Sequence, residues 1–174
     1  AKWLGIETLG ICEENTLAGA LLFQNACQKA QLRSVIGETI CVEYDSSTQY
    51  HIKLYVLNQQ GWINLCQING IINTSKSKSI KIQQLQKFTD GLICVLTATI
   101  SISAIYQTFG NMFDNIFYQL DFVKWKNSTK DEEWLDNLYE YLLSYRDKIQ
   151  PIAIYDCYYL EQQDNEIQPI LWQI

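Results

Sequence analysis

The sequence predicts a single α+β domain in which a mainly antiparallel sheet is packed by about three amphipathic helices. Strand-like segments are grouped together and do not alternate regularly with helices. Apolar residues recur at helical spacing over residues 16–31, 102–120 and 131–149. Residues 92–100 are apolar, β-branched and free of charge, which is typical of a buried central strand. The length of 174 residues and the presence of only two prolines indicate one domain over residues 1–174.

The first predicted helix, residues 16–31, begins where capping and acidic residues precede an apolar pattern. Asn15 or Thr16 can cap it, and Glu13 and Glu14 suit the positive end of its dipole. Its apolar face consists mostly of small side chains. We therefore expect this helix to pack closely on a sheet.

Three strands are expected next, at residues 34–44, 50–57 and 62–68. Turn-forming residues separate them, which favours an antiparallel meander. The dipeptide Asn69-Gly70 follows between apolar residues, and it is the strongest short hairpin signal in the chain.

Residues 102–120 have the strongest helical pattern in the second half of the chain. Nine apolar side chains fall within an arc of about 140° when successive residues are placed 100° apart. The last helix, residues 131–149, begins at a capping Ser or Thr and ends before Pro151. A closing hairpin is expected from residues 152–160 and 167–174.

The charge balance limits the classes of partner. A net charge of −6 and a pI near 4.7 leave no basic excess for the phosphates of duplex nucleic acid, so no such partner is expected. The apolar runs are shorter than the roughly 18 residues of a membrane span. With no recognisable signal peptide, we expect a cytoplasmic protein.

The cysteine and histidine content argues against a structural metal. Six cysteines are spread singly without a C-x-x-C motif, and His51 is the only histidine. We expect reduced thiols in the core, no metal site and no cofactor.

Most enzyme classes lack their motifs in this sequence. It has no phosphate-binding glycine loop and no H-E-x-x-H motif, which disfavours kinases, P-loop NTPases, Rossmann dehydrogenases and zincins. A catalytic triad would have to use His51, which falls in the middle of a predicted strand. We therefore predict no catalytic residue.

One enzyme alternative stays open, a metal-dependent nuclease. Such chemistry needs carboxylates that hold a divalent ion and a lysine near the attacked phosphate. The chain has acidic groups followed by a lysine in that order, although His51 stands where a further acidic residue would be expected. The residues are Glu13, Glu14, Glu38, Glu43, Asp45 and Lys53.

The leading hypothesis is a non-enzymatic protein-binding module, such as an assembly factor, adaptor, accessory subunit or inhibitor of a larger partner. It is based on the missing catalytic motifs, the acidic balance and the apolar groups outside the main helical stripes. The apolar C-terminal segment could also join two copies of the chain. The predicted partner-binding residues are Tyr139, Leu143, Arg146, Asp156, Tyr158 and Trp172.

A second alternative is a small-ligand or sensory domain. The aromatic residues of the predicted helix over residues 102–120 could line an apolar pocket beside that helix. They would otherwise belong to the core.

Overall fold

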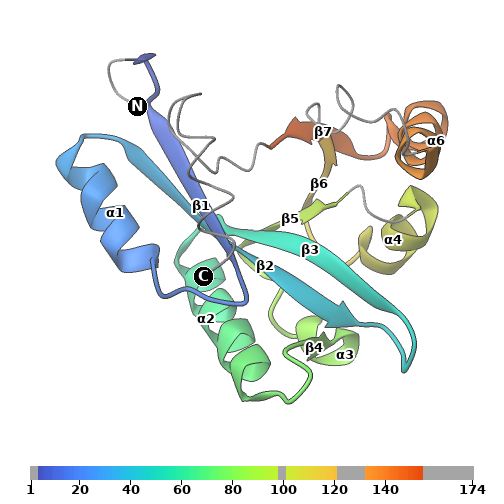
Figure 1. The fold of residues 1–174 in the computed structure, drawn as a ribbon, viewed down its shortest axis with the longest axis horizontal. Helices are drawn as coiled ribbons and strands as arrows, with labels where there is room; N and C mark the ends of the chain where they lie inside the picture. Colours follow the sequence, from blue (N-terminus) through green and yellow to red (C-terminus); the bar gives the residue numbers. More distant parts are fainter. Residues whose placement is uncertain (1–3, 98–100, 121–131, 155–174) are drawn as a thin grey trace, which may run out of the picture.

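The protein is built around one mixed β-sheet (Figure 1). The computed structural model describes residues 4–97, 101–120 and 132–154. Seven strands form the sheet in the order β1-β2-β3-β5-β6-β7, and β4 pairs with β2. The strands are β1 (Thr8–Glu14), β2 (Arg33–Glu43), β3 (Gln49–Val56), β4 (Ile80–Lys81), β5 (Leu92–Leu96), β6 (Asn115–Leu120) and β7 (Gln150–Ala153).

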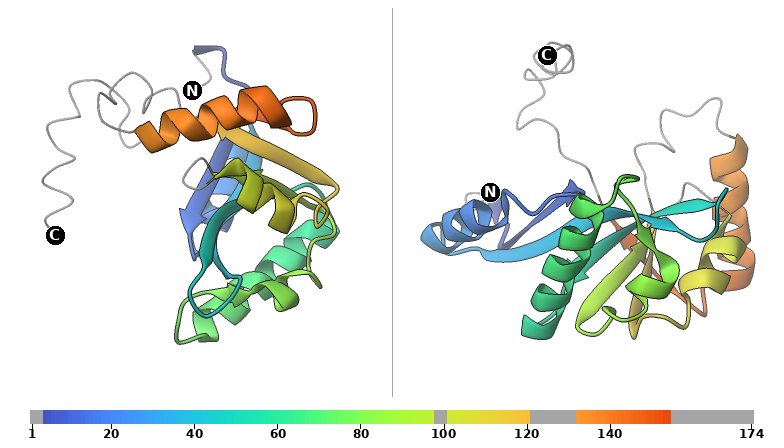
Figure 2. Two further views of the ribbon diagram at one scale, coloured as in Figure 1. Left: turned by 90° about the vertical axis from the view of Figure 1, so that its right-hand side faces the viewer. Right: turned by 90° about the horizontal axis from the view of Figure 1, so that it is seen from below.

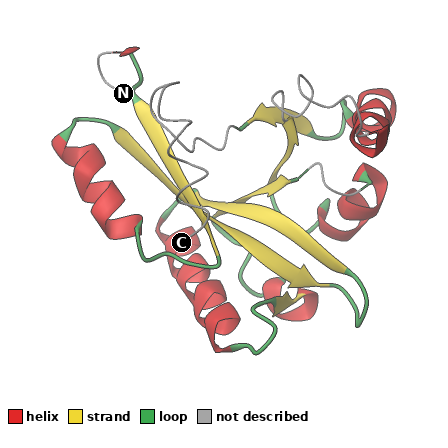
Figure 3. Cartoon of the chain, in the orientation of Figure 1, coloured by secondary structure: helices red, strands yellow, loops and turns green. Residues whose placement is uncertain are grey.

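Helices connect most of the strands (Figure 3). They are α1 (Ala20–Lys29), α2 (Gln59–Thr74), the single turn α3 (Ile82–Leu85), α4 (Ile102–Phe109) and α6 (Glu132–Glu140), which continues into the π-helical segment η2 (Tyr141–Tyr145). α1 connects β1 to β2, α4 connects β5 to β6, and α6 with η2 precedes β7. These are the crossover connections that parallel strands require.

The predicted mainly antiparallel sheet is wrong. β1 and β2 pair in parallel, as do β2 and β4, β5 and β6, and β6 and β7. Only β3 runs against its two neighbours, β2 and β5. The sheet curls into an open half-barrel, as the two further views in Figure 2 show. The sequence did not reveal the parallel pairing, because β6 falls within the range predicted as a helix, residues 102–120.

One face of the sheet carries the core. Ile40 and Val42 of β2 are fully buried, as are Ile52 and Leu54 of β3. The helices contribute apolar side chains to the same cluster, and Tyr118 of β6 is part of it. From the helices come Leu65, Ile68 and Ile72 of α2, Ile102, Ile105 and Phe109 of α4, and Tyr141 of η2. We call this the helix-covered face.

The predicted helix over residues 102–120 is half correct. α4 ends at Phe109, Gly110 is its C-cap, and the chain returns as strand β6. β6 contains Ile116, Phe117 and Tyr118, which belong to residue types with high strand propensity. The spacing of these apolar residues also fits a helix. It does not reveal that the segment pairs with β5, and this pairing makes it a strand.

The predicted strand at residues 62–68 and the hairpin at Asn69-Gly70 are wrong, because both lie within α2. The Asn58 side chain accepts a hydrogen bond from the Gly61 N–H at 3.0 Å and caps the helix. Leu65, Ile68 and Ile72 then form the buried stripe listed above. The helical spacing outweighs the turn preference of the dipeptide.

The remaining helices are shorter than predicted. The range 16–31 contains α1, but Leu22, assigned to the buried face, is 76% exposed. The range 131–149 contains α6 and η2. The strands predicted over residues 34–44, 50–57 and 92–100 match β2, β3 and β5. The predicted closing hairpin lies largely outside the described residues.

Two glycines allow α2 to approach the turn before β5. A Cβ atom on Gly61 would lie 1.8 Å from the carbonyl oxygen of Gly91, so no side chain fits there. Gly91 has φ +71°, a conformation that L-residues rarely adopt. The close contact fixes the start of α2 against the sheet. Among the described residues, no helix is both long and apolar enough to cross a membrane.

We expect Gly61→Ala and Gly70→Ala, two substitutions in the same helix, to change stability in opposite directions. Gly61→Ala should lower the free energy of unfolding by about 2 kcal/mol or more, because the new methyl group would collide with the Gly91 backbone. Gly70→Ala meets nothing within 4 Å and should raise it by about 0.5–1 kcal/mol through helix propensity. Urea denaturation followed by circular dichroism measures both. Equal effects of the two variants would contradict the close contact.

Candidate functional site

The parallel pairing of β1 and β2 places two glutamates side by side. Glu13 and Glu38 are direct partners in the register, so their side chains leave the same face of the sheet. Glu38 is two residues before buried Ile40, and therefore this is the helix-covered face. Glu13 lies next to the last residue of β1, whereas Glu38 lies in the middle of β2. Open α/β sheets carry their ligand sites at the carboxyl ends of their strands, which is where β1 places Glu13.

Glu38 is a fully buried acid with one hydrogen-bond partner among the described residues. Its exposed fraction is 0%, and the Asn69 side chain of α2 donates to its Oε1 atom at 2.7 Å. The Oε2 atom is buried and has no hydrogen-bond partner in the described part of the chain. Burial raises the pKa of Glu38 to about 7, and the hydrogen bond from Asn69 offsets only part of this effect. A proton on Oε2 removes the charge that burial disfavours.

A chain of asparagines connects Glu38 to the loop after β1. Asn69 holds Glu38, and Asn73, one turn further along α2, donates from its amide to the Asn15 carbonyl oxygen at 3.1 Å. Asn15 has φ +53°, and its Oδ1 atom is buried without a partner. Strain and unpaired buried polar atoms both concentrate at functional sites. We call Glu13, Asn15, Glu38, Asn69 and Asn73 the carboxylate site.

The start of α1 contacts the second carboxylate of the site. The Gly19 N–H donates to Glu13 Oε2 at 3.3 Å, and Gly19 is the N-cap of α1. A carboxylate at this place is favoured by the positive end of the helix dipole. The two glutamates therefore have different environments: Glu13 lies at a helix terminus, and Glu38 lies in the core below α2.

Burial brings the pKa of Glu38 close to neutral pH. A carboxyl group with a pKa near 7 can accept or donate a proton at neutral pH, which general acid–base catalysis requires. Glu38 is the acid–base group that the described residues offer at this site.

Comparison with known proteins gives the family. A family model described as the PHP domain matches residues 1–165. The chain belongs to the PHP domain family. The match covers all elements described above.

Curated relatives of this PHP domain are DNA polymerase III alpha subunits. The chain is 23% identical to the Chlamydia pneumoniae subunit over 98% of its own length, which is 17% of that protein. It is 26% identical to the Bacillus subtilis subunit and 32% identical to the Staphylococcus epidermidis subunit, in each case over 55% of this chain and 9% of the relative. The chain thus spans less than a fifth of the length of these relatives.

A solved structure shares the fold of this PHP domain. A protein from Bifidobacterium adolescentis, assigned as a metal-dependent phosphoesterase, superimposes with a TM-score of 0.53 over 88% of this chain and 78% of that one. The sequences are 10% identical, so this likeness concerns the fold alone.

The family overturns the leading functional hypothesis. An adaptor, assembly factor or inhibitor is not supported, since the PHP domain match and the phosphoesterase-like fold are closer to the nuclease alternative. The sensory alternative is not supported either. Phe109 and Phe113, which it placed along an apolar pocket, are packed in the core.

The structure brings together two of the residues proposed for the nuclease alternative. Glu13 and Glu38 share a face, but Glu14 and Lys53 are in register with Thr39 on the opposite face. The Glu43 carboxylate accepts a hydrogen bond from the Ser79 hydroxyl, which together with Ser77 lowers the pKa of Glu43.

Two further predicted residues have local roles or exposed positions. Asp45 Oδ1 accepts hydrogen bonds from the Ser47 and Thr48 N–H groups at 2.8 Å and closes the turn between β2 and β3. His51 is an exposed residue of β3, as predicted.

The described residues offer few charged donors for a metal ion. In residues 4–97, 101–120 and 132–154, no three His, Cys, Asp or Glu side chains gather into a group that could hold an ion. The carboxylate site supplies two carboxyl groups, and burial favours the uncharged form of one of them. A Ca²⁺ ion takes six to eight oxygen ligands, more than two carboxyl groups supply.

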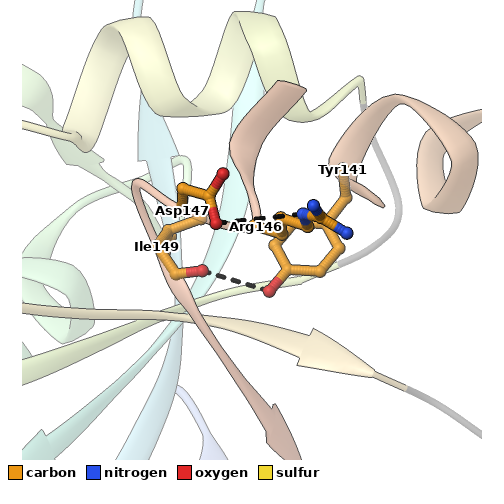
Figure 4. A network of polar contacts seen from close by, with 4 residues as sticks. All are labelled: Tyr141, Arg146, Asp147 and Ile149. Atoms are coloured by element: carbon orange, nitrogen blue, oxygen red, sulfur yellow. Dashed lines mark hydrogen bonds and ion pairs between the residues drawn. The ribbon is translucent and has the colours of Figure 1, made fainter. Parts of the chain in front are cut away.

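The predicted partner-binding residues lie apart from the carboxylate site. Tyr139 of α6 and Leu143 of η2 are 63% and 83% exposed. Figure 4 shows Arg146 near Asp147, with 3.8 Å between Nε and Oδ1, and both side chains are largely exposed. Tyr141 points inward and donates its hydroxyl to the Ile149 carbonyl at 3.1 Å. Asp156, Tyr158 and Trp172 lie outside the described residues.

Sequence patterns missed the three asparagines of the site. Asn69 was assigned to a hairpin turn, and Asn73 to the segment after it. The signal was present, since Asn69 and Asn73 are four residues apart and share one helix face once α2 is assigned correctly. Cys27, Cys41 and Cys94 are buried thiols, as predicted, whereas Cys66 of α2 is exposed and does not belong to the core.

We expect the stability of the protein to fall as the pH rises from 5 to 8. The pKa of Glu38 is about 7 in the folded state and near 4.5 when unfolded, so the folded state binds more protons between these values. The contribution of Glu38 to the free energy of unfolding is complete below about pH 4.5 and is lost as the pH rises through 7. The free energy of unfolding changes by about 3 kcal/mol over this range. Urea denaturation across this pH range measures it.

Glu38→Gln should remove most of this pH dependence, because the amide is neutral and has the same shape. Glu7→Gln, at an exposed position before β1, is the matched control and should keep it. A Glu38→Gln protein with an unchanged slope would show that another group is responsible.

Added Mg²⁺, Mn²⁺ or Zn²⁺ should change the thermal midpoint of the protein by less than about 1 °C. A metal ion that bound the folded state would raise this midpoint. Differential scanning calorimetry after chelator treatment is the measurement. A rise of several degrees that disappears in Glu38→Gln would show that the carboxylate site does hold a metal ion.

Proposed function

We propose that this chain serves as the PHP domain of a DNA polymerase III alpha-type protein. The observation that carries the proposal is the alignment with the Chlamydia pneumoniae alpha subunit across 98% of the chain. The two further relatives have the same name and align with about half of the chain. Residues 1–174 would act as one domain, and a cytoplasmic location follows from a role in DNA synthesis.

The carboxylate site supports this role. It places an acid–base group with a pKa near 7 beside a second carboxyl group, close to the end of β1. In α/β folds with parallel strands, loops at that end carry the chemistry. We infer that this site is where the domain acts.

The exposed surface of α6 and η2 supports a protein partner. Tyr139, Leu142 and Leu143 are 63%, 45% and 83% exposed, and exposed apolar groups of this kind are typical of interfaces. We propose that this surface contacts the polymerase. Arg146, Asp156, Tyr158 and Trp172 complete the proposed contact.

If the proposal is correct, DNA polymerase activity should copurify with the chain. The chain should be tagged at its natural locus and captured from cell extract, and the captured material should be assayed for extension of a primed DNA template. We expect template-dependent incorporation of deoxynucleotides. Capture of the intact chain without any such activity would overturn the proposal.

A double substitution tests the proposed contact surface. Tyr139→Ala/Leu143→Ala should lower the incorporation per captured chain at least fivefold, because it removes exposed apolar contacts without touching the core. Leu22→Ala on α1 removes a similarly exposed leucine and should have no effect. Equal activity of the two variants would place the contact elsewhere.

A further inference from the structure

A pocket on the helix-covered side of the sheet has no role in the function proposed above. It lies between the β2–β3 turn, α3 and α4, and has a volume of about 530 Å³. The polar and aromatic groups around it come from all three segments. They are Tyr44, Tyr50, Gln83, Gln86, Gln107 and Thr108.

The lining of this pocket is uncharged. Three primary amides supply paired donors and acceptors, and the hydroxyl groups add further ones. Among the residues that the structure describes, no Asp, Glu, Lys, Arg or His side chain lines the pocket. A phosphate or carboxylate ligand would find no counter-charge here, whereas a neutral ligand with several hydrogen-bonding edges would be matched.

One wall of the pocket is aromatic and held in place. The Tyr44 ring packs edge-to-face on Tyr50 with centroids 6.0 Å apart, and Tyr50 packs in the same way on Phe109 of α4 at 5.7 Å. Tyr44 is nevertheless 48% exposed, so part of its ring is available to a ligand. The turn that follows is closed by Asp45, whose carboxylate binds two backbone N–H groups. The wall is thus formed before a ligand arrives.

We propose that this pocket binds a nucleobase of single-stranded DNA. A base is planar and neutral and has donors and acceptors on its edges, so it can stack on Tyr44 while the glutamines pair with its edge. Glutamine amides match the N6 and N7 atoms of adenine in particular. The inference rests on the proposed function, because a polymerase part meets single-stranded template.

The overall charge agrees with recognition of a base and not of the backbone. A net charge of −6 disfavours a long phosphate track. Lys81 and Lys87, which flank α3 in the sequence, are exposed and can offset one or two phosphates outside the pocket. The pocket therefore fits one or two bases of a single strand.

Fluorescence anisotropy of a labelled (dA)₁₂ oligonucleotide with the purified chain tests the inference. We expect saturable binding that weakens about tenfold or more in Tyr44→Ala and in Gln86→Ala/Gln107→Ala, since stacking and edge contacts are lost. An abasic oligonucleotide of equal length should bind no better than the variants. Gln67→Ala, an exposed glutamine of α2 outside the pocket, is the control and should bind (dA)₁₂ as the unsubstituted chain does.

Several outcomes would overturn the inference. These are equal binding of the abasic strand, unchanged binding by Tyr44→Ala, or no binding at millimolar oligonucleotide. A Gln-rich or Pro-rich decapeptide that binds with the same sensitivity to Tyr44→Ala, while (dA)₁₂ does not, would assign the pocket to a peptide and would overturn it too. Failure of this test with DNA synthesis still captured by the tagged chain would reject the pocket alone.

Discussion

Strand pairing along β2 is the constraint on which the rest of the structure depends. β2 pairs with β1 and β4 in parallel and with β3 in antiparallel fashion. Side chains alternate along a strand, so burial of Ile40 and Val42 against the helices forces Glu38 onto the same face. An acid thus enters the core as a consequence of the pattern that builds the core. Register with β1 then brings Glu13 beside it.

The parts of the fold that the sequence predicts well are those governed by local pattern. β2, β3 and β5 are continuous apolar or alternating segments, and each matches its predicted range in large part. Two of the failures have one cause, which is a local signal overruled by tertiary contacts. Asn69-Gly70 favours a turn, but the buried stripe of α2 holds it in a helix. Residues 116–118 continue a helical spacing, but pairing with β5 makes them a strand.

The site was predictable only in part for a related reason. Glu13 and Glu38 stood among the acidic residues of the nuclease alternative, and the structure does unite these two. Lys53 was grouped with them by order along the chain, although pairing with Thr39 places it on the other face. The face that a strand residue occupies depends on the register with the neighbouring strands, which the sequence of a single strand does not show. The asparagines were missed because their helix was missed.

α2 joins the glycine contact to the buried acid. Asn69 lies eight residues after Gly61, about 12 Å along the same rigid rod. Any change that lifts the start of α2 from Gly91 also moves the amide that holds Glu38. The backbone contact between Gly61 and Gly91 therefore also sets where the Asn69 amide meets Glu38.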